Sequence, residues 1–268
     1  MFPVLYSLGS LHFYTYGFSL FISLMVIYVL ARRAIPGSLL THDNLDDLML
    51  ILIGSLWLGG GLIHLMVSAL NGPVNWKSLF DIHALQQFSV FPVAVATTLA
   101  LVIWCRWKKL PFLAVIDFLI PFLTLGYGLH RLLGCLNAGC CYGLPTHLPW
   151  GITFPKDPFS SCPLPGIRLH PTQIYLAVLA FVTLWFLYRY KNALQTPGAL
   201  SAAGLAGLSG SYFLVGFLRS DMDLTPLYLG LPSQQLLSLI VFLVTLFMCG
   251  KQWGQPAPPP LDRPSPSP

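Results

Sequence analysis

The sequence contains no glutamate. Nine of its 268 residues are acidic, and every one of the nine is an aspartate. A function that depends on a glutamate base, a glutamate metal ligand or a glutamate–arginine pair is therefore excluded. Charge of either sign is also scarce, because Asp, Glu, Lys and Arg together make up 9% of the chain, whereas a water-soluble domain carries roughly a quarter. This scarcity excludes an ordinary soluble domain.

Hydrophobic residues take the place of the missing charge. They make up 55% of the chain, and the mean hydropathy is +0.71, which indicates an all-α integral membrane protein, since open sheet edges cannot be satisfied in lipid. A helix needs about 20 residues to cross a hydrocarbon core of roughly 30 Å. Seven apolar runs are candidate transmembrane helices: 16–30, 48–70, 88–104, 112–133, 171–188, 198–218 and 233–249.

The two ends of the chain carry separate predictions. Residues 2–13 are apolar and are expected to lie at the membrane interface, and no basic region precedes them, so we expect no cleaved signal peptide. The chain shows no internal repeat, and residues 1–253 are predicted to form one polytopic membrane domain. Residues 254–268 are rich in proline and are predicted to be a disordered cytoplasmic tail.

Lysine and arginine predict the orientation, because cytoplasmic loops are enriched in both. With the N-terminus outside and the C-terminus inside, a small loop region between the fourth and fifth helices is extracytoplasmic. The net charge of +5 is scattered over the segment ends, which argues against nucleic-acid binding. This orientation places nine of the fourteen basic residues on the inner side: Arg32, Arg33, Arg106, Lys108, Lys109, Arg189, Lys191, Lys251 and Arg263.

Three arginines remain at the outer ends of different helices, against the orientation rule. Arg131 is near the end of the fourth helix, Arg168 precedes the fifth, and Arg219 follows the sixth. Guanidinium groups bind phosphate oxygens in bidentate fashion, so the three are predicted to converge on a lipid phosphate. The alternative is that each arginine only anchors its helix at the headgroup layer.

Residues 134–143, GCLNAGCCYG, are predicted to form an irregular backbone segment at a helix exit. Cys140, Cys141 and Cys162 all fall on the predicted outer face, where a disulfide from Cys140 or Cys141 to Cys162 can close the loop. A zinc site that adds His170 to these cysteines is the alternative, but the adjacent pair lacks the usual spacer. Neither a metal nor another cofactor is predicted.

His170 lies in RLHPTQIY at the start of the fifth helix. As a functional residue it is a candidate general base, because histidine titrates near neutral pH. As a structural residue it caps the helix or contacts the headgroup layer. Elsewhere, Asp117 in the fourth helix is predicted to make a structural hydrogen bond.

Two other groups have structural interpretations. The Gly59–Gly61 run in the second helix is expected to allow close helix packing, with His64 as a buried hydrogen-bond partner. In HFYTYG, at the start of the first helix, His12, Tyr14 and Tyr16 are predicted to form an aromatic belt.

Taken in order, these segments resemble the bacterial prolipoprotein diacylglyceryl transferase family. The motifs are YTYG, IDFLIP, GCLNAGCCYG, RLHPTQIY, GALSAAGLAG, FLRSD and LPSQQLLS, which cover nearly the whole chain. Members are seven-helix enzymes of the bacterial inner (plasma) membrane. They move the diacylglyceryl group of phosphatidylglycerol to the lipobox cysteine of a prolipoprotein and release glycerol phosphate. The resemblance implies the same substrates here.

The resemblance and the residue patterns together assign the site. Arg131, Arg219 and His170 are the predicted catalytic residues. The predicted substrate-binding residues are Tyr16, Asn137, Gly139, Tyr142, Arg168, Gln173, Tyr175 and Gln235.

The chain also departs from the family pattern. Phe91 replaces a histidine or tyrosine, Cys140 replaces the loop glutamate, and Tyr212 and Gly216 replace an arginine and a glutamate. Gly61 and Leu176 replace a further arginine and glutamate. Arg131 lies one residue further from the loop than in the family, which is about 100° around a helix.

These departures leave two other functions open. One is a catalytically silent lipid-binding or scaffold subunit of a membrane complex, which the replaced polar residues favour. The other is an outward-facing thiol protein that uses Cys140, Cys141 and Cys162.

Overall fold

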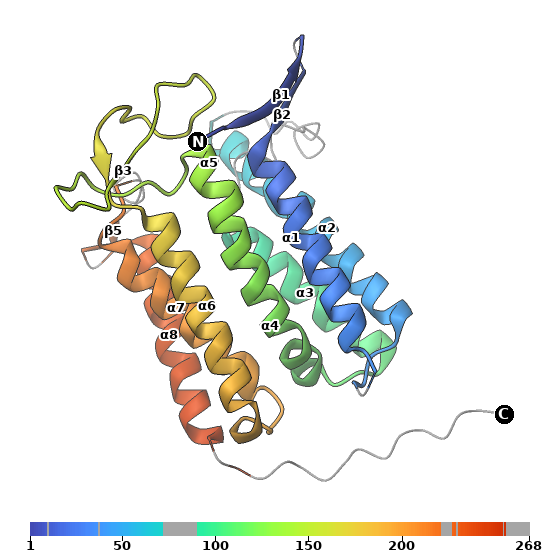
Figure 1. Ribbon diagram of the computed structural model, residues 1–268. Coiled ribbons are helices and arrows are strands. Elements are labelled where there is room, and N and C mark those ends of the chain that lie inside the picture. Colours follow the sequence, from blue (N-terminus) through green and yellow to red (C-terminus); the bar gives the residue numbers. More distant parts are fainter. Residues whose placement is uncertain are drawn as a thin grey trace. The chain divides into compact units, whose positions relative to one another are not determined.

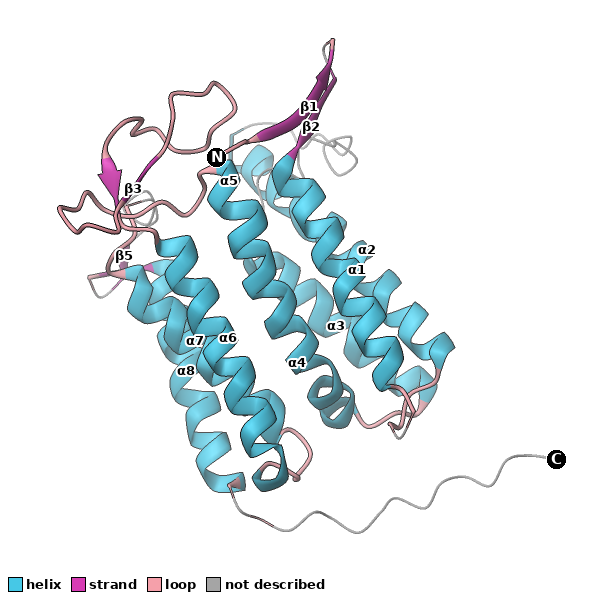
Figure 2. Cartoon of the chain, viewed as in Figure 1, coloured by secondary structure: helices cyan, strands magenta, loops and turns pink. Residues whose placement is uncertain are grey.

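The computed structural model is mainly helical and describes residues 1–9, 11–36, 38–71, 90–220, 227–228, 230–253 and 255 (Figure 2). It divides into two compact units, which are described separately. One unit comprises Met1–Val29 and Ile116–Pro268, and the other comprises Leu30–Val115.

Seven helices of 18 residues or more lie in the described part of the chain, and each overlaps one of the predicted apolar runs (Figure 1). Five described segments are long and apolar enough to cross a membrane, namely Thr15–Ala34, Phe112–Ala138, Thr172–Ala193, Ala199–Gly216 and Ser233–Gln252. The chain is therefore a multi-pass membrane protein. The long helices are α1 (Thr15–Ala34), α2 (His42–Asn71), α3 (Val90–Lys108), α4 (Phe112–His130), α6 (Thr172–Tyr190), α7 (Ala199–Gly216) and α8 (Ser233–Gln252).

The N-terminal segment differs from its prediction. It forms a hairpin of β1 (Val4–Leu8) and β2 (Leu11–Tyr14), whose turn contains Gly9 at φ +60°. Of the predicted helical belt, only Tyr16 lies in α1. His12 and Tyr14 lie on β2, and their rings pack on Phe159 with centroids 4.6 and 6.2 Å away. A left-handed glycine between two aromatic-rich segments favours a hairpin over a longer helix.

Small residues of α7 allow close packing within the first unit. A Cβ added to Gly204 would lie 2.5 Å from Ile120 of α4, and one added to Gly207 would lie 2.5 Å from Thr183 of α6. Ala199, Ala202 and Ala203 of α7 belong to the same buried apolar cluster as Ile120 and Leu187. Without a strong hydrophobic drive between helices in lipid, such small-residue contacts supply much of the association.

Asp117 of α4 caps the N-terminus of α7. Its Oδ2 accepts a hydrogen bond from the Gly198 backbone N–H at 2.6 Å. Its Oδ1 accepts bonds from the backbone N–H and the hydroxyl of Ser201, both at 2.7 Å. The predicted structural role of Asp117 is therefore confirmed, since a carboxylate at a helix N-terminus satisfies orphan donors and complements the helix dipole.

The end of α4 continues through a π-helical turn, Arg131–Cys135, into the short helix α5 (Leu136–Ala138). Short paired strands follow in the connecting loops. These are β3 (Ile152–Thr153) with β4 (Arg168–Leu169), and β5 (Leu227–Tyr228) with β6 (Leu231–Pro232). A 3₁₀ turn, Lys191–Ala193, follows α6.

In the second unit, α2 packs against α3. The Asp47 carboxylate is 2.9 Å from the Lys108 ammonium and accepts a hydrogen bond of 3.1 Å from Trp104 Nε1. Those two hydrogen bonds lower the pKa of Asp47.

Several sequence predictions lie outside the described residues. Gly59–Gly61 and His64 fall within α2 and Phe91 within α3, but their side chains are not described. The predicted disordered tail lies almost entirely outside the described residues as well.

Candidate functional site

Three segments of the first unit meet around the loop that follows α5. Leu144 N donates to Leu218 O at 2.8 Å beyond the end of α7, and His170 N donates to Leu144 O at 3.0 Å. Ser220 N donates to Tyr142 O at 3.1 Å, and Thr146 N to Arg168 O at 2.9 Å. The loop therefore lies between the end of α7 and the start of α6 and is hydrogen-bonded to both (Figure 1).

Arg131 is buried at the start of the π-helical turn, with 7% of its surface exposed. Its Nη1 donates to Cys141 Sγ at 2.9 Å and to Cys135 Sγ at 3.6 Å, and its guanidinium lies 4.8 Å from the Tyr127 ring centre. A π turn holds one residue more than an α turn. The extra residue that sets Arg131 apart from the family pattern is therefore absorbed, and the side chain still reaches the loop.

Arg219 also lies beside the loop. It is 6% exposed, its guanidinium lies 5.0 Å from the Tyr212 ring centre, and its backbone pairs with Gly143. Hydrogen bonds from the Cys135 and Cys140 thiols, followed by the charges of Arg131 and Arg219, hold the pKa of Cys141 well below its usual range. Two buried cations therefore act on one sulfur.

Arg168 does not belong to this pair. It is exposed on β4, and its aliphatic stem lies against Gly151. Of the three arginines predicted to converge, Arg131 and Arg219 both lie near Cys141, Arg168 is exposed, and phosphate binding stays a prediction. The positions of the arginines in the sequence do not predict that Arg168 is exposed, because its direction depends on the short strand β4.

The cysteines group differently from the prediction. The Sγ atoms of Cys135, Cys140 and Cys141 all lie within 4.8 Å of one another. Cys162 instead packs with Tyr142, Phe154 and Leu169 in a separate apolar cluster, and all six cysteines of the chain are free in the structure. The predicted bridge to Cys162 is therefore not formed here.

Cys135 was missed because it precedes Cys140 by five residues. Such a spacing brings two thiols together only when the intervening backbone turns back on itself, as the end of α5 does here. Hydrogen bonds with Cys135 and Cys141, together with burial, raise the pKa of Cys140.

The backbone of the cysteine pair is held by the first turn of α6. Gln173 is fully buried, and its Nε2 donates to Cys140 O at 2.7 Å, while the Thr172 hydroxyl donates to Cys141 O. Cys141 has a φ of +58°, a conformation that costs a non-glycine residue about 1–3 kcal/mol and persists only where its surroundings impose it. Gln173 thus holds the backbone of the loop at Cys140, and its predicted contact with substrate stays a prediction.

Gly139 and Tyr142, whose predicted substrate binding stays a prediction, make packing contacts in the loop. Gly139 has a φ of +75°, and a Cβ there would lie 2.7 Å from Ser160 Oγ and 3.2 Å from Cys162 Cβ. Tyr142 is buried in the apolar cluster with Phe154 and Leu169. Both residues fix the loop.

Tyr16 of α1 and Asn137 of α5 both lie near the end of α4. The Tyr16 ring packs edge-on against His130 at 4.6 Å, and His130 Nδ1 is 2.9 Å from Ser19 Oγ. Asn137 Oδ1 accepts a hydrogen bond of 3.3 Å from Phe2 N, and its Nδ2 donates to Leu133 O at 2.9 Å. His130 was missed, although it directly precedes Arg131 in the sequence.

His170 and Tyr175 form a second polar group at the start of α6. His170 Nδ1 is 3.3 Å from Tyr175 Oη, which also accepts a hydrogen bond of 2.8 Å from Trp150 Nε1. Sequence reasoning missed Trp150 because it lies in the long loop. The predicted roles of His170 and Tyr175 stay predictions.

Gln235 is 2% exposed, and its Nε2 donates to Phe213 O at 3.1 Å. A Cβ on Gly216 would lie 3.0 Å from Gln235 Cδ, so the small residue at this position makes room for the glutamine. Next to it, the Tyr212 hydroxyl donates to Gln234 Oε1 at 2.6 Å.

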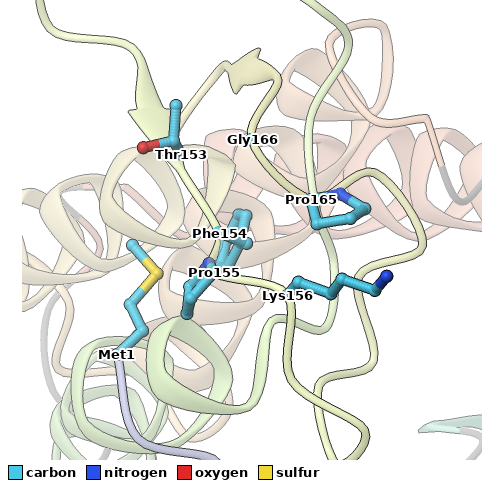
Figure 3. A pocket seen from close by; sticks show the side chains of 7 residues that line it. All are labelled: Met1, Thr153, Phe154, Pro155, Lys156, Pro165 and Gly166. Carbon is cyan, nitrogen blue, oxygen red and sulfur yellow. The ribbon is translucent and has the colours of Figure 1, made fainter.

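Two hollows border these groups. A groove of about 380 Å³ runs between α6 and α7 and is lined by Tyr175, Val178, Leu179, Leu214, Val215 and Leu218. A second hollow of about 590 Å³ is lined by Met1 and by residues of the α5–α6 loop, among them Phe154, Pro155, Lys156 and Pro165 (Figure 3). Leu218, which lines the groove between α6 and α7, directly precedes Arg219 in the sequence. The lining of this groove is almost entirely apolar.

Comparison with known proteins gives a consistent result. The family model for prolipoprotein diacylglyceryl transferase matches residues 3–250. The relatives of this chain named phosphatidylglycerol–prolipoprotein diacylglyceryl transferase include three from different bacteria. That of Geobacter sulfurreducens is 31% identical over 257 residues, covering 92% of this chain and 93% of the relative. That of Bordetella avium is 30% identical over 250 residues, covering 90% of each. That of Clostridium tetani is 28% identical over 247 residues, covering 92% and 96%. The chain therefore belongs to the prolipoprotein diacylglyceryl transferase family.

Proposed function

We propose that this chain transfers the diacylglyceryl group of phosphatidylglycerol to the cysteine thiol of a prolipoprotein lipobox and releases glycerol phosphate. The names of its relatives support the two substrates. The observation that carries the proposal is the pair of buried arginines, Arg131 and Arg219, whose charges both act at Cys141.

The reaction explains why two buried cations are useful. The thiolate attacks the diacylglyceryl carbon, and the phosphate oxygen that leaves gains negative charge. Preorganised cations at that oxygen stabilise the transition state more than the ground state. Arginine is suited to this role because its planar fork matches phosphate oxygens.

The apolar groove between α6 and α7 suits an acyl chain of the lipid. The residues that line it, which include Val178 and Leu218, offer almost no polar group. Leu218 is followed directly by Arg219 in the sequence. A phosphate held by Arg219 would leave the attached acyl chain next to this groove.

The candidate base is His170, whose ring contacts Tyr175 beside the same loop. In its proposed setting the protein has seven transmembrane helices, with the N-terminus outside in the plasma membrane of a bacterium. The site then faces the outer leaflet, where a translocated prolipoprotein arrives.

The test uses purified protein in phosphatidylglycerol-containing micelles with a lipobox peptide. We expect glycerol phosphate release and a thioether product from the wild type. Arg131→Gln and Arg219→Gln are each expected to lower kcat by about 10²–10³, the cost of one preorganised charge partner. Arg189→Gln is the matched control, because Arg189 is exposed at the opposite end of α6.

Three outcomes would count against parts of this proposal. Bound phosphatidylglycerol without product in the wild type would favour the silent lipid-binding relative. Activity that survives both arginine substitutions would remove the phosphate assignment. Activity that survives His170→Ala would remove His170 as the base.

A further inference from the structure

The cysteine cluster beside the arginines has a composition that phosphate binding does not require. Its three sulfurs, from Cys135, Cys140 and Cys141, lie within 4.8 Å of one another. A tetrahedral zinc ion with Zn–S bonds of about 2.3 Å places its sulfurs about 3.8 Å apart. Side-chain shifts of about 1 Å or less would therefore bring the three sulfurs onto one ion.

The backbone is shaped to bring the adjacent pair together. In extended chain, successive side chains point to opposite faces, so Cys140 and Cys141 would normally diverge. Cys141 instead has a φ of +58°, and both carbonyls are held by hydrogen bonds from Gln173 and Thr172. A strained residue held in this way indicates a functional requirement.

Arg131 is placed as an outer-sphere partner of such an ion. Guanidinium groups only donate hydrogen bonds, so the sulfurs of Cys141 and Cys135 are the acceptors at 2.9 and 3.6 Å. Donors to ligand atoms orient and tune metal sites. With zinc, three thiolates and the two arginines Arg131 and Arg219, the formal charge is +1, which favours a thiolate as the fourth ligand.

We propose that Cys135, Cys140 and Cys141 form a three-sulfur zinc site whose open fourth position binds the lipobox cysteine as a thiolate. This inference rests on the proposed transferase function. Catalytic zinc sites have three protein ligands and one open position, and a thiol bound to zinc is deprotonated. The site would therefore supply the nucleophile that the reaction needs in a chain without glutamate.

The step balances as follows. The lipobox thiol binds zinc and gives its proton to His170 or to water. Its sulfur then forms a bond to the diacylglyceryl carbon, and the bond from that carbon to the phosphate oxygen breaks. Thiolate and phosphodiester carry one negative charge each, and the departing glycerol phosphate carries two. The neutral thioether leaves the zinc, because a thioether is a much weaker ligand for this ion than a thiolate.

Metal content tests the site without reference to activity. Full-length protein purified in detergent without chelators is expected to contain about one zinc per chain. Cys135→Ser and Cys140→Ser are expected to lower this to background. Cys162→Ser is the matched control, since Cys162 is also buried but lies in the separate apolar cluster. Thermal unfolding of each variant checks that the fold persists.

Cobalt replacement gives a readout on the wild type alone. Co²⁺ added to the metal-stripped protein is expected to produce sulfur-to-cobalt charge-transfer bands, which a lipobox peptide shifts and the same peptide with serine for cysteine does not. Absence of both zinc and these bands would overturn the metal site. Bands that do not respond to the cysteine peptide would overturn the fourth ligand.

The remaining outcomes separate this inference from the proposed function. Bands that shift with the peptide while no transfer product forms would keep the metal site and refute the transferase. Transfer activity in a protein free of zinc would do the reverse. A disulfide within the cluster, with no metal uptake after reduction, would assign the three cysteines to redox chemistry instead.

Discussion

Replacing Asp117 should destabilise the first unit by a predictable amount. The carboxylate accepts three hydrogen bonds of 2.6–2.7 Å from Gly198 and Ser201, two of them from backbone N–H groups at the start of α7. No side chain of α7 itself caps this end, because the N-cap residue is Gly198. Loss of a cap costs about 0.5–2 kcal/mol, and a hydrogen bond to a charged group contributes about 1.5–3 kcal/mol.

These contributions overlap, because the cap and the hydrogen bonds to the charged carboxylate are the same three contacts. We therefore expect Asp117→Ala to cost about 2–4 kcal/mol. Asp117→Asn keeps one oxygen for Ser201 but turns an amide donor toward the Gly198 N–H, so it should cost about 1.5–3 kcal/mol. At about 2–4 °C per kcal/mol for a chain of this size class, both shifts are measurable.

The assay is reversible unfolding in detergent micelles, followed by circular dichroism. Ser209→Ala is the control in the same helix, because the Ser209 hydroxyl bonds only to carbonyls of α7, and it should stay within about 0.5 kcal/mol. An Asp117→Ala variant no less stable than this control would refute the capping argument. So would equal losses for Asp117→Ala in the wild type and in a Ser201→Ala background, since the two residues share hydrogen bonds and should not be additive.

Two further predictions concern packing and pH. Gly216→Ala places a methyl group 3.0 Å from Gln235 Cδ and should lower the free energy of unfolding by about 1–3 kcal/mol through overpacking. The control Gly250→Ala, with nothing within 4 Å of the added methyl group, should be neutral or stabilising. Equal unfolding midpoints for the two variants would contradict this prediction. Asp47 has a lowered pKa because of Lys108 and Trp104, so its stabilisation is present above the unfolded pKa of about 3.9 and is lost as the pH falls through the lower folded value. Because Asp47 is partly exposed, its pH-dependent contribution to the free energy of unfolding should be below about 1 kcal/mol. This contribution should be absent in Asp47→Asn. A stability difference between variant and wild type that stays constant from pH 6 to pH 3 would contradict the prediction.

Hydropathy was sufficient to locate the long helices in the described part of the chain, because length and apolar content are the requirements that lipid imposes. It did not reveal the N-terminal hairpin of β1 and β2, because an apolar strand pair and an apolar helix have the same composition. Asp117 was predictable because a lone carboxylate in an apolar helix must find partners. Its partners on α7 were not, since they are 81 and 84 residues away in the sequence.

The site was predictable as residue types but not as a grouping. Arg131 and Arg219 are exceptional in sequence because they are charges at the predicted outer ends of apolar helices. The π-helical turn is not visible in the sequence, so the extra residue after Arg131 predicts a misdirected side chain. The structure shows instead that this turn returns Arg131 to the loop, at 2.9 Å from Cys141.

In a chain without glutamate, the two buried arginines need another negatively charged group, and the cysteine cluster can supply it. Buried guanidinium groups cost several kcal/mol unless anions accompany them. No glutamate is present anywhere in the chain, yet both arginines stay buried. The hydrogen bonds from Arg131 and the lowered pKa of Cys141 assign the anionic role to sulfur. A thiolate at Cys141 supplies negative charge beside the two arginines, and sulfur ligands have a preference for soft metal ions.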